Sequence, residues 1–122
     1  MSLILWEHIS KTDHDEIDHQ HQRMLESINT LRVLHQRGQQ AAIAIALDDI
    51  AVFLQQHFAF EERLMHDSDY AYLEPHEIAN KLFLKKVARF QQRFAAQEDM
   101  FEEMHASFTR WINFHIHMMN RQ

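Results

Sequence analysis

The chain has 122 residues, a length that suits one domain with a single core. Its formal net charge of -6, from 18 acidic and 12 basic residues, disfavours a nucleic acid or an anionic membrane as a partner. The absence of cysteine excludes disulfides, thiolate nucleophiles and sulfur-bound metal sites. No apolar run approaches the length of a membrane span, and residues 1–6 lack the basic start of a secretion signal, so we expect a cytoplasmic protein.

Turn-forming residues are nearly absent, since the chain has one glycine, Gly38, and one proline, Pro75. This composition favours a few long helices joined by short loops over a sheet. Gly38 is placed to end a helix, and Pro75 to lie in the first turn of another. After a short polar arm, apolar residues at helical spacing predict four helices, over about 15–37, 39–66, 75–94 and 101–119.

The apolar stripe of each predicted helix contains polar residues at one end only. His57 and Glu61 are four residues apart on the apolar face of the second helix, so they should point into a core rather than form a surface salt bridge. A buried imidazole and a buried carboxylate each need a partner, and a metal ion satisfies both. The polar exceptions in the other stripes are His21 near the start of the first helix, His76 and Asn80 near the start of the third, and His115 near the end of the fourth.

Four helices with short connections predict an all-α, antiparallel up-down-up-down bundle. In that topology the start of the first helix, the end of the second, the start of the third and the end of the fourth share one end of the molecule. Independent surface histidines would have no reason to follow this rule. We therefore expect five residues to converge as metal ligands: His21, His57, Glu61, His76 and His115.

The nitrogen and oxygen ligands suit iron, zinc, copper or manganese. Five candidates exceed one tetrahedral zinc site and fit two metal ions that share Glu61 as a bridge. Two further pairs, Glu16 with His19 and Glu102 with His105, have the Glu-x-x-His spacing of ferritin-like proteins. They belong to opposite ends of the bundle, about 25–30 Å apart, so we expect both pairs to lie on solvated helix faces.

The chain resembles the hemerythrin family over nearly its whole length. The resemblance implies a non-heme diiron centre, two Fe ions with an oxo or hydroxo bridge, that binds O2 reversibly. It implies that His21 and His57 hold one iron, that Glu61 bridges, and that His76 and His115 hold the other. The residues that carry the resemblance are Trp6, the segment Ile17-Asp18-His19-Gln20-His21, the segment His57-Phe58-Ala59-Phe60-Glu61-Glu62, Tyr70, His76, Phe83, and the segment Trp111-Ile112-Asn113-Phe114-His115-Ile116.

Two positions depart from the family pattern. Asn80 stands where a second histidine is expected four residues after His76, and Asn120 where a bridging aspartate is expected five residues after His115. An amide is a weak ligand and carries no charge, although either residue could coordinate or hydrogen-bond a ligand. We therefore expect the iron at His76 and His115 to be weakly held, less well neutralised when ferric, and open to water or a small anion.

Apolar side chains should line the space beside the metals. In the family such residues make a dry pocket for O2, and they are equally what any bundle core requires. The expected pocket residues are Met24, Ile28, Phe58, Trp111 and Ile116.

The favoured function is an oxygen or redox sensor domain with a ligand-depleted, readily oxidised iron pair. Because Gln122 follows Asn120 without a helix cap, we expect a single domain, residues 1–122, excised from a longer signalling protein. Its C-terminal output domain would be of the diguanylate cyclase or chemoreceptor kind, and a homodimer is compatible with this role. The alternatives are a plain O2-binding or iron-storing hemerythrin and a mononuclear or metal-free structural bundle. Enzymatic activity is not expected, beyond a weak turnover of peroxide at an open iron site.

Overall fold

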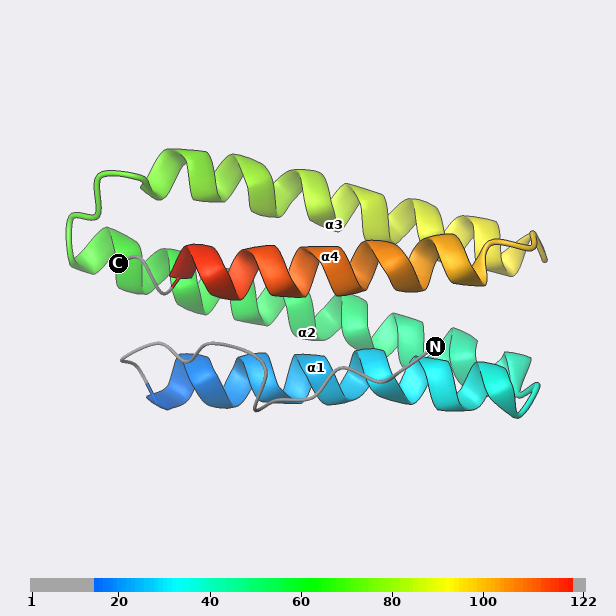
Figure 1. Cartoon of the computed structure of the whole chain (residues 1–122). Helices are drawn as coiled ribbons and strands as arrows, with labels where there is room; N and C mark the ends of the chain where they lie inside the picture. The colour runs from blue at the N-terminus through cyan, green and yellow to red at the C-terminus, as the bar shows by residue number, and fades with distance from the viewer. Residues whose placement is uncertain (1–14, 120–122) are drawn as a thin grey trace.

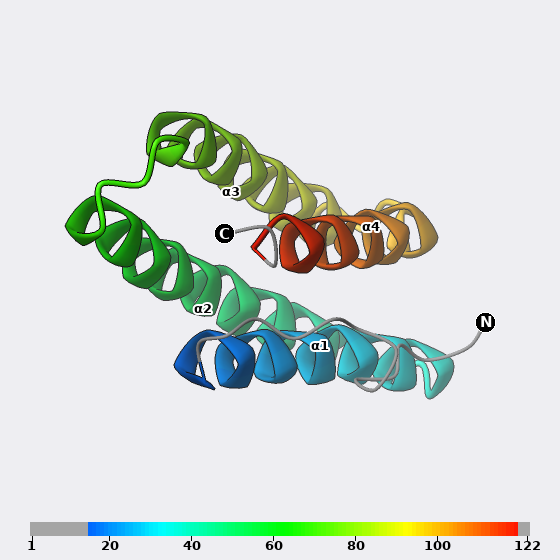
Figure 2. The same ribbon diagram turned by 60° about the vertical axis from the view of Figure 1, so that its left-hand side comes forward.

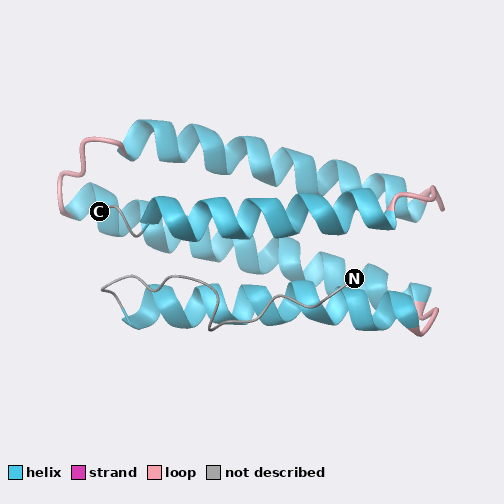
Figure 3. Cartoon of the chain, viewed as in Figure 1, coloured by secondary structure: helices cyan, strands magenta, loops and turns pink. Residues whose placement is uncertain are grey.

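The computed structural model describes residues 15–119, which form four helices that run alternately up and down (Figure 1). Within this part of the chain there is no strand, and short turns join the helices (Figure 3). The all-α up-down-up-down bundle is thus confirmed, whereas Trp6 and Asn120 lie outside the described residues. The helices are α1 (Asp15–Gln36), α2 (Gln40–Asp67), α3 (Leu73–Ala95) and α4 (Phe101–Met119).

A residue in the left-handed backbone region lies two positions after the end of each of the first three helices. Gly38 has φ 68°, Asp69 has φ 53° and Gln97 has φ 62°. After α1, the Gly38 N–H bonds to the His35 carbonyl and the next N–H bonds to the Leu34 carbonyl, both at 3.0 Å. The same pair of bonds follows α2 and α3, so all three ends satisfy their last carbonyl groups in a Schellman motif. Only the first of these turns uses glycine, which is why the sequence signalled it most clearly.

The core is shared by all four helices. Helix α2 packs against both α1 and α3, and α4 packs against α1. Figures 1 and 2 agree that α1 and α3 lie on opposite sides of the bundle. Phe83 of α3 reaches α4, where its ring stacks on Trp111 with centroids 4.6 Å apart. The expected stripes therefore face one another, and their aliphatic and aromatic residues form one continuous core.

The start of α1, the end of α2, the start of α3 and the end of α4 lie together at the left of Figure 1. The polar exceptions of the four stripes are located at this end. His21, His57, Glu61, His76 and His115 are all buried, none being more than 5% exposed. Up-down topology has thus gathered buried polar groups from distant parts of the sequence at one end of a dry core.

At the opposite end of the bundle, His105 does not lie where the sequence predicted it. Glu16 and His19 are exposed as expected, but His105 is only 3% exposed and does not lie on a solvated face. Its Nε2–H donates to the Ile28 carbonyl at 3.2 Å, and its Nδ1 accepts from Arg32 Nη2 at 3.4 Å. Helical spacing from Glu102 could not show that a buried arginine of α1 would satisfy this imidazole.

The ion pair between Arg32 of α1 and Glu102 of α4 is expected to stabilise the bundle. Arg32 is 4% exposed, and its Nη1 and Nη2 donate to Glu102 at 2.8 and 2.7 Å. Glu102→Ala should lower the free energy of unfolding by about 1–2 kcal/mol, because the buried guanidinium of Arg32 loses its carboxylate partner. The loss should not be larger, because Glu102 is exposed and solvent screens the ion pair. Urea unfolding measures the change. The matched control is Glu103→Ala, which breaks the exposed pair with Arg93 and should change stability little; an equal loss in both variants would contradict the prediction.

Helix α2 is long and apolar enough to cross a membrane by length and composition, contrary to the expectation from its sequence. This is weak evidence, because the core helix of a bundle passes the same test. The buried residues of α2 include His57 and Glu61, and its apolar face belongs to the shared core. The packing in the bundle accounts for its hydropathy.

Candidate metal centre

Three imidazoles converge on the carboxylate of Glu61. His21 Nε2 and His57 Nε2 each lie 3.0 Å from Glu61 Oε2, and His115 Nε2 lies 2.9 Å from Glu61 Oε1. The four ligand atoms all lie within 4.8 Å of one another. Three different helices contribute to this group, which could hold a metal ion.

The position of each residue follows from helix geometry. His57 and Glu61 are one turn apart on α2, so their side chains share a face. His21 is close to the first residue of α1 and His115 is in the last part of α4, so both helices bring an imidazole to the end of α2. Glu61 and His21 have no exposed side-chain surface. Within the part of the chain that the structure describes, the cluster is therefore buried away from water.

Burial and neighbouring charges set the protonation states. Burial raises the pKa of Glu61, but the charge and hydrogen bond of His115, with hydrogen bonds from His21 and His57, outweigh it and hold that pKa well below its usual range. Burial lowers the pKa of His21, although its hydrogen bond to Glu61 opposes the change. An ionised carboxylate and a neutral imidazole are the forms that bind metal ions.

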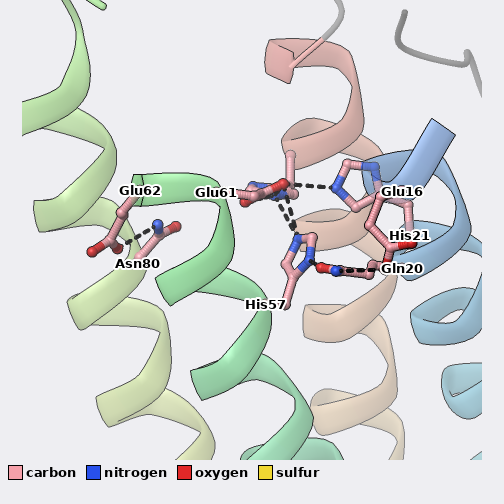
Figure 4. Close-up of polar contacts among 8 residues, drawn as sticks. Glu16, Gln20, His21, His57, Glu61, Glu62 and Asn80 are labelled. Atoms are coloured by element: carbon pink, nitrogen blue, oxygen red, sulfur yellow. Dashed lines mark hydrogen bonds and ion pairs between the residues drawn. The ribbon is translucent and has the colours of Figure 1, made fainter. Parts of the chain in front are cut away.

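The second nitrogen of His57 is held by Gln20. His57 Nδ1–H donates to Gln20 Oε1 at 2.7 Å, and Gln20 Nε2 donates to Glu16 Oε1 at 3.0 Å (Figure 4). Because Glu16 can only accept, the amide oxygen of Gln20 faces the imidazole. This contact places a hydrogen on Nδ1 and leaves Nε2 of a neutral His57 free to bind a metal.

The donor set therefore fits a cation. His57 Nε2 lies 3.0 Å from Glu61 Oε2 and 3.4 Å from His115 Nε2. The ionised carboxylate of Glu61 is buried in a dry core and requires a positive charge beside it. A metal ion supplies that charge, and the resulting ligands would be His21, His57, His115 and Glu61.

Gln20→Leu should weaken metal binding without unfolding the bundle. The loss of the acceptor at His57 Nδ1 frees the ring to rotate and to change tautomer, which should cost about 10–100-fold in metal affinity. Competition with a coloured chelator measures the affinity. Gln55→Leu is the matched control, since Gln55 is an exposed glutamine of α2 and its loss should change nothing. Equal affinity in the Gln20 variant would show that the contact does not orient His57.

His76 and Asn80 lie apart from this group of four. His76 is buried at 4% exposure, and its ring packs on Tyr70 with centroids 5.8 Å apart, but it does not belong to the cluster of ligand atoms. Burial, and then the nearby His115, lowers the pKa of His76. Asn80 Nδ2 donates to Glu62 Oε2 at 3.0 Å. Figure 4 shows Glu62 directed toward Asn80 and Glu61 directed to the other side of α2, toward His21 and His57.

The apolar residues expected beside the metals surround the cluster in part. Trp111 stacks on the His115 ring with centroids 4.9 Å apart, and Phe58 contacts both of these rings at 5.6 and 5.8 Å. Met24, Ile28 and Ile116 are at most 1% exposed and belong to the same core. Aromatic rings thus fix the His115 imidazole and keep water from it.

Gln20 is the site residue that the sequence reasoning did not single out. It lay inside the segment that carries the family resemblance, but its role was not assigned. Two signals could have found it: Gln20 precedes His21 directly, and it follows Glu16 by one helical turn. What sequence could not show is that Gln20 reaches across to α2.

The fold and the cluster define a class of protein: a four-helix bundle with a buried histidine and carboxylate site that could hold metal. Comparison with known proteins agrees, because the model of the hemerythrin HHE cation binding domain matches residues 5–122. Bacteriohemerythrin of Stenotrophomonas maltophilia (strain R551-3) is 35% identical over 116 residues, which cover 95% of this chain and 76% of that protein. Bacteriohemerythrin of Pseudomonas paraeruginosa is equally similar, and that of Campylobacter jejuni (serotype O:6) is 30% identical over 81 residues, 65% of this chain and 61% of the relative. The chain belongs to the hemerythrin family.

Proposed function

We propose that this chain is a non-heme diiron domain that binds or reacts with O2. The observation that carries the proposal is the convergence of His21, His57 and His115 on Glu61 in a buried core. Iron at these ligands would supply the redox chemistry that O2 binding requires. These side chains would hold the ions, the contact with Gln20 orients His57, and the core excludes water.

We further propose that the domain senses oxygen or redox state instead of carrying O2. Support comes from Asn80, which is tied to Glu62 and offers no imidazole at a position where the family pattern has one. Together with Asn120, this change would leave positions on the second iron open to water or small anions. Open positions favour rapid oxidation and ligand exchange over a long-lived O2 complex. Met24, Ile28, Phe58, Trp111 and Ile116 would line the O2 pocket.

Stopped-flow spectroscopy of the anaerobic, iron-loaded protein tests the proposal. On mixing with O2 the ferrous protein should become ferric in a single fast phase, and no adduct should persist. Asn80→His adds the imidazole that the family pattern contains and should slow this oxidation; Asn113→His, at an exposed position of α4, is the matched control. An adduct that forms and releases O2 reversibly in the unaltered protein would contradict the sensor role and favour a plain O2-binding or iron-storing domain.

The remaining alternative is a mononuclear or metal-free structural bundle. Failure of the purified protein to retain any iron would establish the metal-free form.

We propose no catalytic turnover. In the sensor role the domain would act in the cytoplasm on a C-terminal output domain or on a second copy of itself, and loss of a signalling output on mutation of His57 would test that link.

A further inference from the structure

Two surfaces of this chain complement each other in charge: an exposed ridge on α3 and a groove between α1 and α2. We infer that the ridge of one copy docks into the groove of a second copy, so that copies of the chain associate side by side through unlike surfaces. None of the residues involved is a proposed metal ligand, so the inference does not depend on iron or O2. It goes beyond the proposed function by specifying the surfaces through which a second copy would bind.

The ridge follows the outer face of α3. Its residues are Ile78, Leu82, Lys85 and Arg89, and all four are exposed. They are three or four residues apart in sequence, so they lie in one line along the helix, about 16 Å long. Ile78 and Leu82 expose 53% and 60% of their surface, although both are large aliphatic residues. The ridge is therefore apolar toward the metal end of the bundle and cationic toward the other end.

The ridge is basic in a chain that is otherwise acidic. Helix α3 has five basic and two acidic residues, whereas each of the other three helices has more acidic than basic residues. Within the described part of the chain, the arginine and lysine residues that form ion pairs are Arg32 and Arg93, so Lys85 and Arg89 have no acidic partner in the same molecule. The acidic helices beside the ridge would repel a membrane or a nucleic acid, since the net charge is -6. A narrow acidic surface suits the ridge better.

The groove between α1 and α2 offers such a surface. It has a volume of about 400 Å³, and Glu26 and Thr30 of α1 line it together with Asp49 and Phe53 of α2. Neither Glu26 nor Asp49 forms an ion pair among residues 15–119, so both carboxylates are free to meet a cation from outside. Helices α1 and α3 lie on opposite sides of the bundle (Figures 1 and 2), so one copy can use its ridge and its groove at the same time.

The two surfaces match when both copies run in the same direction. Arg23 and Phe53 form the end of the groove nearest the metal centre, where the Arg23 guanidinium lies 4.9 Å from the centroid of the Phe53 ring. Glu26 and Asp49 follow about one helical turn farther from that end. In this direction the aliphatic part of the ridge faces Phe53, and Lys85 faces the two carboxylates. The opposite direction would place the cations of the ridge against Arg23.

The contact should be weak and should not stop at a dimer. A ridge about 16 Å long covers less area than a stable interface needs, so association should be reversible. Because unlike surfaces meet, each added copy leaves one ridge and one groove free for the next. Repulsion between the net charges of two copies is screened beyond about 10 Å at 0.1 M salt, whereas ion pairs in contact persist until the salt is much higher.

Sedimentation equilibrium of the full chain at increasing concentration tests the inference. The average mass should rise with concentration, and it should rise less in 1 M salt. Lys85→Glu and Asp49→Lys should each weaken association by at least about 10-fold, because like charges would then face each other. Arg110→Glu is the matched control, since it makes the same charge change as Lys85→Glu at an exposed position of α4 outside both surfaces. Circular dichroism verifies that each variant is helical.

An equimolar mixture of the two variants identifies the partner surfaces. The variant that keeps Lys85 can dock into the groove that keeps Asp49, so the mixture should associate although neither variant does so alone. If the mixture does not associate, or if Asp49→Lys leaves association unchanged, the ridge does not dock into this groove and the inference is wrong. It is equally wrong if the unaltered protein stays monomeric, or if the ridge binds phosphatidylglycerol vesicles instead of a second copy. Each of these outcomes leaves the diiron proposal intact, because iron content is measured separately.

Discussion

Glu61→Gln is expected to abolish metal retention while the bundle stays folded. Glu61 is the one carboxylate within the cluster, and all three imidazole Nε2 atoms lie at 2.9–3.0 Å from its oxygens. Glutamine keeps the volume but removes the charge that a cation requires. Loss of a residue that only orients a ligand costs about 10–100-fold, so loss of this direct ligand should exceed that range. Metal content after dialysis, and chelator competition, measure the effect.

Glu62→Gln is the matched control for this experiment. Glu62 is adjacent in sequence and carries the same charge, but it contacts Asn80 on the α3 side of α2 (Figure 4). Its replacement should leave metal retention unchanged. If both variants lose metal equally, net charge near the end of α2, and not the position of Glu61, controls binding.

The metal-free protein is expected to lose stability steeply as the pH falls from about 7 to about 5. Burial lowers the pKa of His21, His76 and His105 below the usual value of 6.5. Below pH 6.5 the unfolded chain therefore takes up protons that the folded chain resists. Stability contributed by these groups is complete above that pH and decreases as the pH falls toward their folded pKa values, by about 1 kcal/mol per pH unit for each group.

Glu61 contributes in a different pH range. Its pKa is lowered well below 4.5 in the folded protein, so its stabilisation is present above 4.5 and is lost only in stronger acid. The histidines alone should thus set the slope between about pH 5 and about pH 7. Urea unfolding of chelator-treated protein at several pH values measures this slope.

Two variants test whether the buried histidines cause the dependence of stability on pH. His105→Leu removes one buried imidazole far from the metal centre and should reduce the slope by about one third, if the three groups contribute equally. His66→Gln removes an exposed imidazole, 79% exposed in its side chain, and should leave the slope unchanged. A slope that is unaffected by His105→Leu would show that this histidine titrates alike in the folded and unfolded chains.

Much of the fold could be predicted from the sequence because its signals are local. Apolar spacing in each helix, one glycine and one proline were enough to define four helices within a few residues. The turns after α2 and α3 were less evident, because Asp69 and Gln97 adopt the left-handed conformation that glycine marks openly at position 38. Up-down topology then placed five buried polar residues at one end of the bundle.

The sequence by itself therefore determined most of the residues that face the core, although not His105, and the end of the bundle at which they lie. Periodicity fixes the direction of a side chain around its own helix, and topology fixes its height along the bundle. Only the tertiary structure decided that His115 meets His21, His57 and Glu61 while His76 stays outside. It also decided that Gln20 reaches His57 and that Arg32 hydrogen-bonds to His105. These outcomes depend on the distances between helices, which are set by the packing of many side chains and leave no mark in the spacing of any single helix.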